Sequence, residues 1–185
     1  MLAVLLTSSP LPARSGPHGW QTRVNRDAQL IGEFLKAVDA YVQIHHKVDA
    51  ALPEAASSAP PEQVEAHRRA LERAISNARG RARPGDIFKQ SVRAYFRRQI
   101  ARTVAGPDGA QLKAAIMEDN PGRIKLRVNA PYPDTVPLST MPPQILAALP
   151  KLPKELEFRF LGDRLILLDI HAQLVVDYMD DAVPR

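Results

Sequence analysis

The stretch LEFRFLGDRLILLDIHAQLVVDYM, residues 156–179 of 185, carries the strongest structural signal in this chain. Its first part, 156–161, alternates apolar with charged side chains, which is the period of a half-buried strand. Residues 165–170 are almost continuously apolar, as in a central strand covered on both faces, and 174–179 make a third apolar run. The turns between these runs are too short for anything except hairpins. The sequence therefore predicts a three-stranded antiparallel meander at the centre of the fold.

Apolar seams upstream of the meander predict a helical hairpin. Residues 27–52 place apolar side chains at alternating spacings of three and four, the pattern of an amphipathic helix that Pro53 ends. A second, thinner seam runs through 61–78 and stops before Gly80. The loop between the two seams is short, so we expect an antiparallel pair of helices.

The remaining segments complete the predicted fold. The basic connector 80–86 is expected to act as a hinge. Further helices are expected over 91–105, around 112–116 and over 143–149. Residues 123–129 alternate apolar side chains with Arg and Lys, so we expect a basic fourth strand that pairs beside 156–161.

The sequence thus predicts an α+β protein, with an N-terminal helical hairpin, two further helices and a C-terminal four-stranded antiparallel sheet. We divide the chain into residues 1–25, 26–80 and 81–185. The first part is rich in Pro, Ser and Gly and is expected to be a disordered tail or a shortened signal segment. The second part is the helical hairpin, and the third is the α+β core.

Composition narrows the chemistry that is open to this protein. The chain has no cysteine, which excludes disulfides, thiolate metal sites and cysteine nucleophiles. No run approaches the roughly 18 apolar residues of a transmembrane helix. The Gly-x-Ser-x-Gly motif of hydrolases, a phosphate-binding loop and a dinucleotide fingerprint are all missing. We therefore expect no cofactor and favour binding over catalysis.

Positive charge is concentrated in one part of the chain, although the whole chain carries only +5. Between Arg68 and Arg102, ten arginines and one lysine are opposed only by Glu72 and Asp86. The candidate anion-binding residues form two i, i+4 pairs on the third predicted helix: Arg93, Arg97, Arg98 and Arg102. They predict an anionic surface or an acidic protein as partner. Nucleic acid is the weaker alternative, because zinc-finger spacing and RNA-binding aromatic signatures are missing.

These four arginines admit two structural interpretations. If they bind a partner, they should point to solvent, because the apolar side chains of the same helix occupy its buried stripe. If they stabilise the fold, they should form bidentate pairs with the acidic C-terminal half, residues 155–181. We favour exposure, since four arginines within ten residues exceed what one docking contact needs.

The histidines are the candidates for metal binding or catalysis. His45 and His67 lie on helices that we expect to be antiparallel, and Asp49 follows His45 by one turn, so these three residues are the candidate metal ligands. His171 lies two residues after Asp169, which leaves open a catalytic dyad in a small hydrolase. No His-Glu-x-x-His signature accompanies them. Polar residues are also expected at the end of a strand, and we therefore expect no metal.

Three blocks of the sequence carry a resemblance to a bacterial family. They are PGDIFKQSVRAYFRR (84–98), YPDTVPLSTMPPQILAALP (132–150) and ELEFRFLGDRLILLDIHAQLVVDYM (155–179). They resemble blocks of small, mostly exported proteins that have no assigned function. The resemblance implies a periplasmic or secreted protein, and it supplies no catalytic residues. A cytoplasmic location is the alternative, because the signal peptide of such relatives is here reduced to a short apolar run over 2–6.

Overall fold

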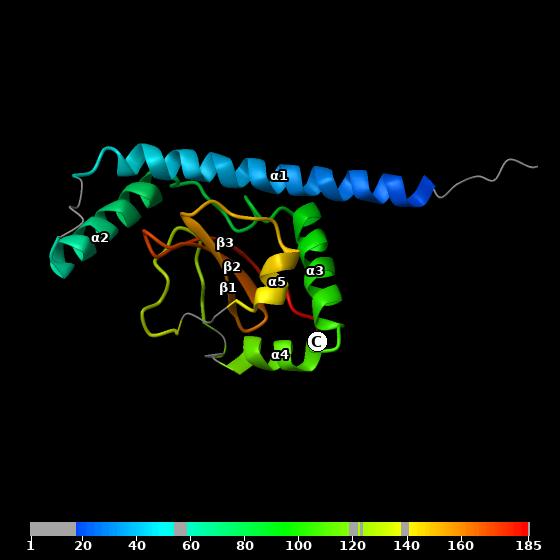
Figure 1. Cartoon of the computed structure of the whole chain (residues 1–185). Helices are drawn as coiled ribbons and strands as arrows, with labels where there is room; N and C mark the ends of the chain where they lie inside the picture. Colours follow the sequence, from blue (N-terminus) through cyan, green and yellow to red (C-terminus); the bar gives the residue numbers. More distant parts are fainter. Residues whose placement is uncertain (1–17, 54–58, 119–121, 123, 138–140, 185) are drawn as a thin grey trace, which may run out of the picture.

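The fold is α+β, as predicted. The computed structural model describes residues 18–53, 59–118, 122, 124–137 and 141–184, with side chains from Arg26 onward. This part of the chain holds five helices and one three-stranded sheet (Figure 1). The elements are α1 (His18–Asp49), α2 (Pro61–Ala78), α3 (Gln90–Val104), α4 (Gly109–Glu118), α5 (Pro143–Ala148), β1 (Leu156–Leu161), β2 (Arg164–Asp169) and β3 (Leu174–Met179).

The three strands form the predicted antiparallel meander, in the order β1-β2-β3. β1 pairs with β2 along its whole length, whereas the pairing of β2 with β3 shifts at Val176, the extra residue of a bulge. Side chains of β2 enter a core on both faces of the sheet, Leu165 and Leu167 on one face and Ile166 and Leu168 on the other. The continuous apolar run of this strand follows from burial on both faces.

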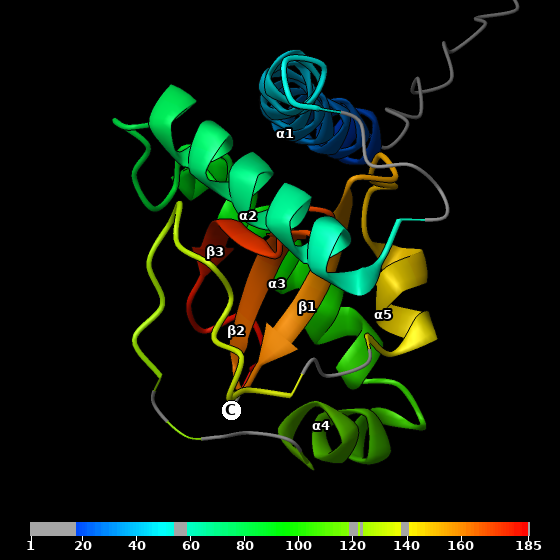
Figure 2. The ribbon, with the colours of Figure 1, turned by 90° about the vertical axis from the view of Figure 1, so that its left-hand side faces the viewer.

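Helices enclose one face and one end of the sheet. α1 lies across one end of the strands, with α2 beside it, while α3 and α5 lie against one face (Figures 1 and 2). Four phenylalanine rings from these helices, the connector before α3 and the sheet contact one another at the centre: Phe34, Phe88, Phe96 and Phe158. Side chains from 26–80 and from 81–185 therefore share one core.

The expected fourth strand is wrong. Residues 124–127 form no strand, and the segment 124–137 instead covers the second face of the sheet, where Leu126 and Tyr132 pack in a smaller apolar cluster. Its backbone pairs with the start of β3, not with β1, through three backbone hydrogen bonds around an isolated bridge between Pro131 and Leu174. Proline lacks an N–H donor, so the prolines of this segment prevent a regular ladder. The alternating pattern was real, but it serves to cover a sheet face.

The first helix begins at His18, earlier than the predicted Asp27. Pro17 stands just before the helix, where a proline is tolerated, and no proline follows until Pro53. The predicted tail therefore overlaps α1 at 18–25, while residues 1–17 lie outside the described residues. No helix in the described part of the chain is long and apolar enough to span a membrane.

Candidate functional site

Four of the five histidines gather at the end of the sheet that α1 crosses. His45 and His46 lie near the end of α1, His67 lies on α2, and His171 lies in the turn between β2 and β3. The rings of His45 and His171 are 5.4 Å apart between centroids, and those of His45 and His46 are 5.7 Å apart. Clusters of titratable groups beside a cavity are candidate functional sites.

The centre of this cluster is a buried pair between α1 and β2. His45 is 1% exposed and Asp169 is 0% exposed. Nδ1 of His45 lies 2.6 Å from Oδ2 of Asp169, and the Tyr41 hydroxyl donates to the same oxygen at 2.6 Å. The other oxygen accepts the backbone N–H groups of His171 and Ala172, at 2.9 and 2.8 Å. The Asp169 carboxylate thus fixes the β2–β3 turn and joins it to α1.

Burial and pairing act in opposite directions on this pair. Burial alone would lower the pKa of His45, but the hydrogen bond and charge of Asp169, with Asp49 and Glu155 nearby, raise this pKa overall. Burial alone would raise the pKa of Asp169, but hydrogen bonds from His45, Tyr41 and the backbone lower it overall. Both shifts favour the ion pair. Burial and the Asp169 charge also raise the pKa of Tyr41, which keeps its hydroxyl a donor.

A second pair joins α1 to the segment that leads into β1. Nε2 of His46 lies 2.8 Å from Oε1 of Glu155, whose side chain is 4% exposed. Burial would raise the pKa of Glu155, but the His46 hydrogen bond, a backbone hydrogen bond and the histidine charges lower it overall. The backbone of Glu155 also accepts the N–H of Ile170 at 3.0 Å.

The predicted hydrolase dyad and metal triad are not assembled in this geometry. Asp169 binds the side chain of His45, whereas His171 contributes its backbone N–H. His67 and Asp49 do meet, at 3.1 Å between Nε2 and Oδ1, but Nδ1 of His67 lies 3.1 Å from the Pro53 carbonyl oxygen. Among the described residues, no group of three or more His, Asp or Glu is placed to hold a metal ion. The reason is that His45 turns toward the sheet and His67 toward the end of α1.

A cavity of about 400 Å³ opens beside these histidines, between α2 and the β2–β3 turn. Its lining residues come from the end of α1, from α2 and from the turn: Asp49, Val64, His67, Arg68, Leu71, Ile170, His171 and Gln173. A smaller cavity of about 240 Å³ shares Gln173 with it and lies against the segment 132–136.

The predicted arginine face is divided by the structure. Nε of Arg93 donates to the Phe88 carbonyl at 2.7 Å, and Arg97 donates to the carbonyls of Asp181 and Asp180 at 2.9 and 2.8 Å. Both residues are half-buried. Arg97 does reach the acidic C-terminal segment, but through backbone oxygens, a partner that neither interpretation had considered.

Arg98 and Arg102, in contrast, differ in exposure. Arg98 is half-buried, pairs with Asp27 of α1 and lies over the Tyr95 ring at 5.6 Å. Arg102 is exposed. Three of the four candidates therefore hold α3 against its neighbours, and Arg102 faces solvent.

Other basic residues are also exposed, and five of them make up what we call the basic surface: Arg73, Arg81, Arg83, Lys125 and Arg127. They belong to α2, to the connector after it and to the segment that covers the second sheet face. Asn129 holds that segment to α2, because its side chain accepts from Arg79 at 2.7 Å and donates to the Arg79 carbonyl at 2.6 Å. Figure 2 shows the segment rising to the C-terminal end of α2.

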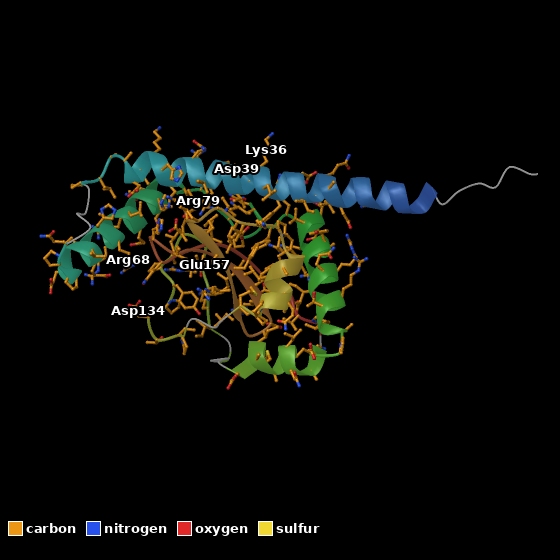
Figure 3. The ribbon with its side chains drawn as sticks, viewed as in Figure 1. Lys36, Asp39, Arg68, Arg79, Asp134 and Glu157 are labelled. Atoms are coloured by element: carbon orange, nitrogen blue, oxygen red, sulfur yellow. The ribbon has the colours of Figure 1, made fainter. Side chains whose placement is uncertain are left out.

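Arg79, the residue that caps the C-terminus of α2, turns inward. It lies between α1 and the sheet (Figure 3), 4.9 Å from the centre of the Tyr41 ring, and donates to the carbonyl of the bulged Val176 at 3.2 and 3.3 Å. Burial lowers its pKa, and the nearby Tyr41, Asp177 and Asp86 oppose that shift. Sequence reasoning missed Arg79 and Tyr41, although a tyrosine and a histidine inside the seam of α1 were a signal that the helix meets a polar partner.

Comparison with known proteins does not assign the chain to a family. No protein-family model matches the chain, and neither a curated protein nor a solved structure is significantly similar to it. The resemblance to exported bacterial proteins therefore stays a prediction.

Proposed function

We propose that this protein is a binding protein that attaches to an anionic lipid surface through its basic surface. The observation that carries the proposal is that Arg73, Arg81, Arg83, Lys125 and Arg127 are exposed, whereas Arg93, Arg97 and Arg98 are engaged within the fold. The chain has a net charge of +5. Cations near an anionic leaflet contribute about 1 kcal/mol each.

The kind of partner follows from what accompanies these cations. A protein interface centres on apolar or aromatic anchors, and single-stranded nucleic acid is bound by stacking on aromatic rings. The large apolar residues that are exposed in the described part of the chain are Val64, Met117, Leu146 and Ile170. None of them belongs to the basic surface. Charge without an anchor suits the diffuse field of lipid headgroups best.

Two variants of equal charge test the proposal. In the first, Arg73, Arg81 and Arg83 are changed to Gln, and in the control, the exposed Lys36, Arg102 and Lys151 are changed to Gln. Each set lowers the net charge by three, from +5 to +2. Co-sedimentation with phosphatidylglycerol vesicles at low salt measures the affinity. The affinity of the first variant should fall roughly a hundredfold, and that of the control far less.

Binding should also be lost at high ionic strength, because exposed charges are screened. Equal losses in the two variants would show that net charge alone is responsible and would refute the assignment of the surface. Tighter binding to duplex DNA or to an acidic protein than to vesicles would show that this other ligand, and not lipid, is the partner of the basic surface.

We propose in addition that the protein is exported, on the basis of the sequence resemblance alone. Fractionation of bacterial cells that express the full chain tests this, since an exported protein should be recovered outside the cytoplasmic fraction. Recovery only with the cytoplasm would refute it.

A further inference from the structure

We infer that the cavity of about 400 Å³ between α2 and the β2–β3 turn is a binding site for a small molecule with a carboxylate on an apolar body. Ligand sites of small molecules commonly have volumes of about 300–1,000 Å³, with apolar walls and a few polar groups that fix orientation. This site is separate from the basic surface, and none of the five residues that define that surface lines the cavity.

The apolar wall is unusual because it is exposed. Val64 is 52% exposed and Ile170 is 37% exposed, and both line the cavity together with the buried Leu71. Two of the four large apolar side chains that are exposed in the described residues thus face one small space. An apolar body placed there would remove both from water, which favours binding.

The polar wall offers donors for one anionic group. Nε and Nη2 of Arg68 donate hydrogen bonds to the Glu65 carboxylate, at 2.7 and 2.6 Å. Its Nη1 has only a long contact of 3.4 Å with the Ala172 carbonyl. Figure 3 shows Arg68 on the side of α2 that faces the segment of Asp134. His171 and Gln173 are exposed on the opposite wall, and both side chains can donate hydrogen bonds.

The surrounding charges favour a single negative charge on the ligand. Glu65 already neutralises part of the Arg68 guanidinium. Asp49 lines the same cavity, and Asp134 is near enough for its charge to act on Arg68. A doubly charged phosphate would be repelled by these carboxylates, whereas a carboxylate needs only one or two donors.

The wall formed by the turn is held in place before any ligand arrives. Asp169 accepts the backbone N–H groups of His171 and Ala172 and is itself bound to His45. A preorganised site loses less conformational entropy on binding. The buried pair therefore acts as a support for the cavity and does not line it.

The test uses the full chain and the probe 4-methylpentanoate, followed by amide NMR shifts during titration. Saturable shifts are expected at residues 64–71 and 170–173. Arg68→Met should weaken binding about tenfold or more, since a charge-assisted hydrogen bond is lost. The matched control is Arg69→Met, the neighbouring arginine, which also binds Glu65 but is 62% exposed in its side chain and does not line the cavity. The affinity of the Arg69→Met variant for the probe should be unchanged.

The apolar wall has its own pair of variants. Ile170→Ser should weaken the probe severalfold, whereas Leu146→Ser, at an exposed apolar residue outside the cavity, should not. The amine 4-methylpentylamine and inorganic phosphate should produce no saturable shift at these amides. The inference is overturned if the amine or phosphate binds as tightly as the carboxylate. It is also overturned if Arg69→Met weakens binding as much as Arg68→Met, or if the probe causes no saturable shift there.

Discussion

Asp169 and Asp177 are two carboxylates of the same meander, both 0% exposed, but different kinds of donor satisfy them. Asp177 lies in β3 and receives four backbone N–H groups at 2.8–2.9 Å. The donors are Gly85, Ile87, Phe88 and Tyr178. Asp169 lies at the end of β2 and receives two backbone N–H groups, the Tyr41 hydroxyl and the His45 ring.

The two sets of donors differ in whether they can change their hydrogen-bonding role. A backbone N–H can only donate a hydrogen bond. The four donors around Asp177 therefore require a side chain with two acceptor oxygens. Tyr41 and His45 can each either donate or accept. The carboxylate of Asp177 therefore fastens the connector before α3 to the sheet through donors that cannot change their role, whereas the pair at Asp169 depends on the protonation of a histidine.

The largest expected effect comes from Asp177→Asn. The amide NH₂ of Asn would face two backbone N–H groups and cannot accept a hydrogen bond from either. This should lower the free energy of unfolding by about 3 kcal/mol. Urea denaturation measures the loss. The control is Asp180→Asn, whose side chain is 57% exposed and pairs with Arg164 at the surface. It should lose less than about 1 kcal/mol.

The same substitution at Asp169 should have a smaller effect. In Asp169→Asn the amide oxygen can keep the two backbone N–H groups, and the NH₂ can donate to a neutral His45 or to the Tyr41 oxygen. We expect a loss of about 1.5 kcal/mol in the same urea experiment. Equal losses for the two Asn variants would contradict the comparison between fixed and switchable donors.

The pH dependence of stability should distinguish the two sites further. The pKa of His45 is raised above its usual 6.5, so its stabilisation is complete below that pH and is lost as pH rises through the raised value. The pKa of Asp169 is lowered below its usual 3.8, so its stabilisation is present above that pH and is lost as pH falls through the lowered value. The stability difference between the parent and Asp169→Asn should therefore be largest between these pH values.

Unfolding curves at about pH 5 and about pH 9 measure this difference. It should shrink at the higher pH, by less than the whole effect of the substitution, because hydrogen bonds remain. A difference that is the same at both pH values would show that His45 is not charged in the fold.

The smallest expected effect is that of Tyr41→Phe. The ring keeps its place under Arg79, but the hydroxyl that donates to Asp169 is lost, which should lower the free energy of unfolding by about 1 kcal/mol. Asp169 Oδ2 still has His45, so the change should be milder than Asp169→Asn. A loss as large as that of Asp177→Asn would mean that Tyr41, not His45, is the main partner of Asp169.

Much of the fold was predictable because its signals are local. The alternation in 156–161, the continuous apolar run that follows and the two short turns were enough to predict the meander, and it is confirmed. The seams of 27–52 and 61–78 predicted α1 and α2, with an error at the start of α1. The apolar side of 123–129 was also recognised, but its partner was not. An alternating pattern says that one side is buried and does not say whether a strand or a face lies against it.

The candidate site was less predictable, because its members come from distant parts of the chain. His45 and Asp169 were each singled out, but with the wrong partners, and they are 124 positions apart. The sequence shows a cationic group that includes Arg93, Arg97 and Arg98. Their partners are backbone carbonyls and Asp27, which the periodicity of the helix cannot predict.

Local sequence patterns were enough to predict most of the elements, their order and the sides that they bury, since turn residues and apolar periodicity act within a few residues of chain. Which polar groups meet depends instead on how the elements pack. α1 comes to rest across the end of the sheet because its apolar seam must be buried, and that docking brings Tyr41 and His45 to Asp169. Hydrophobic burial sets the position, and each buried polar group must then find a donor or acceptor within hydrogen-bond reach at that position.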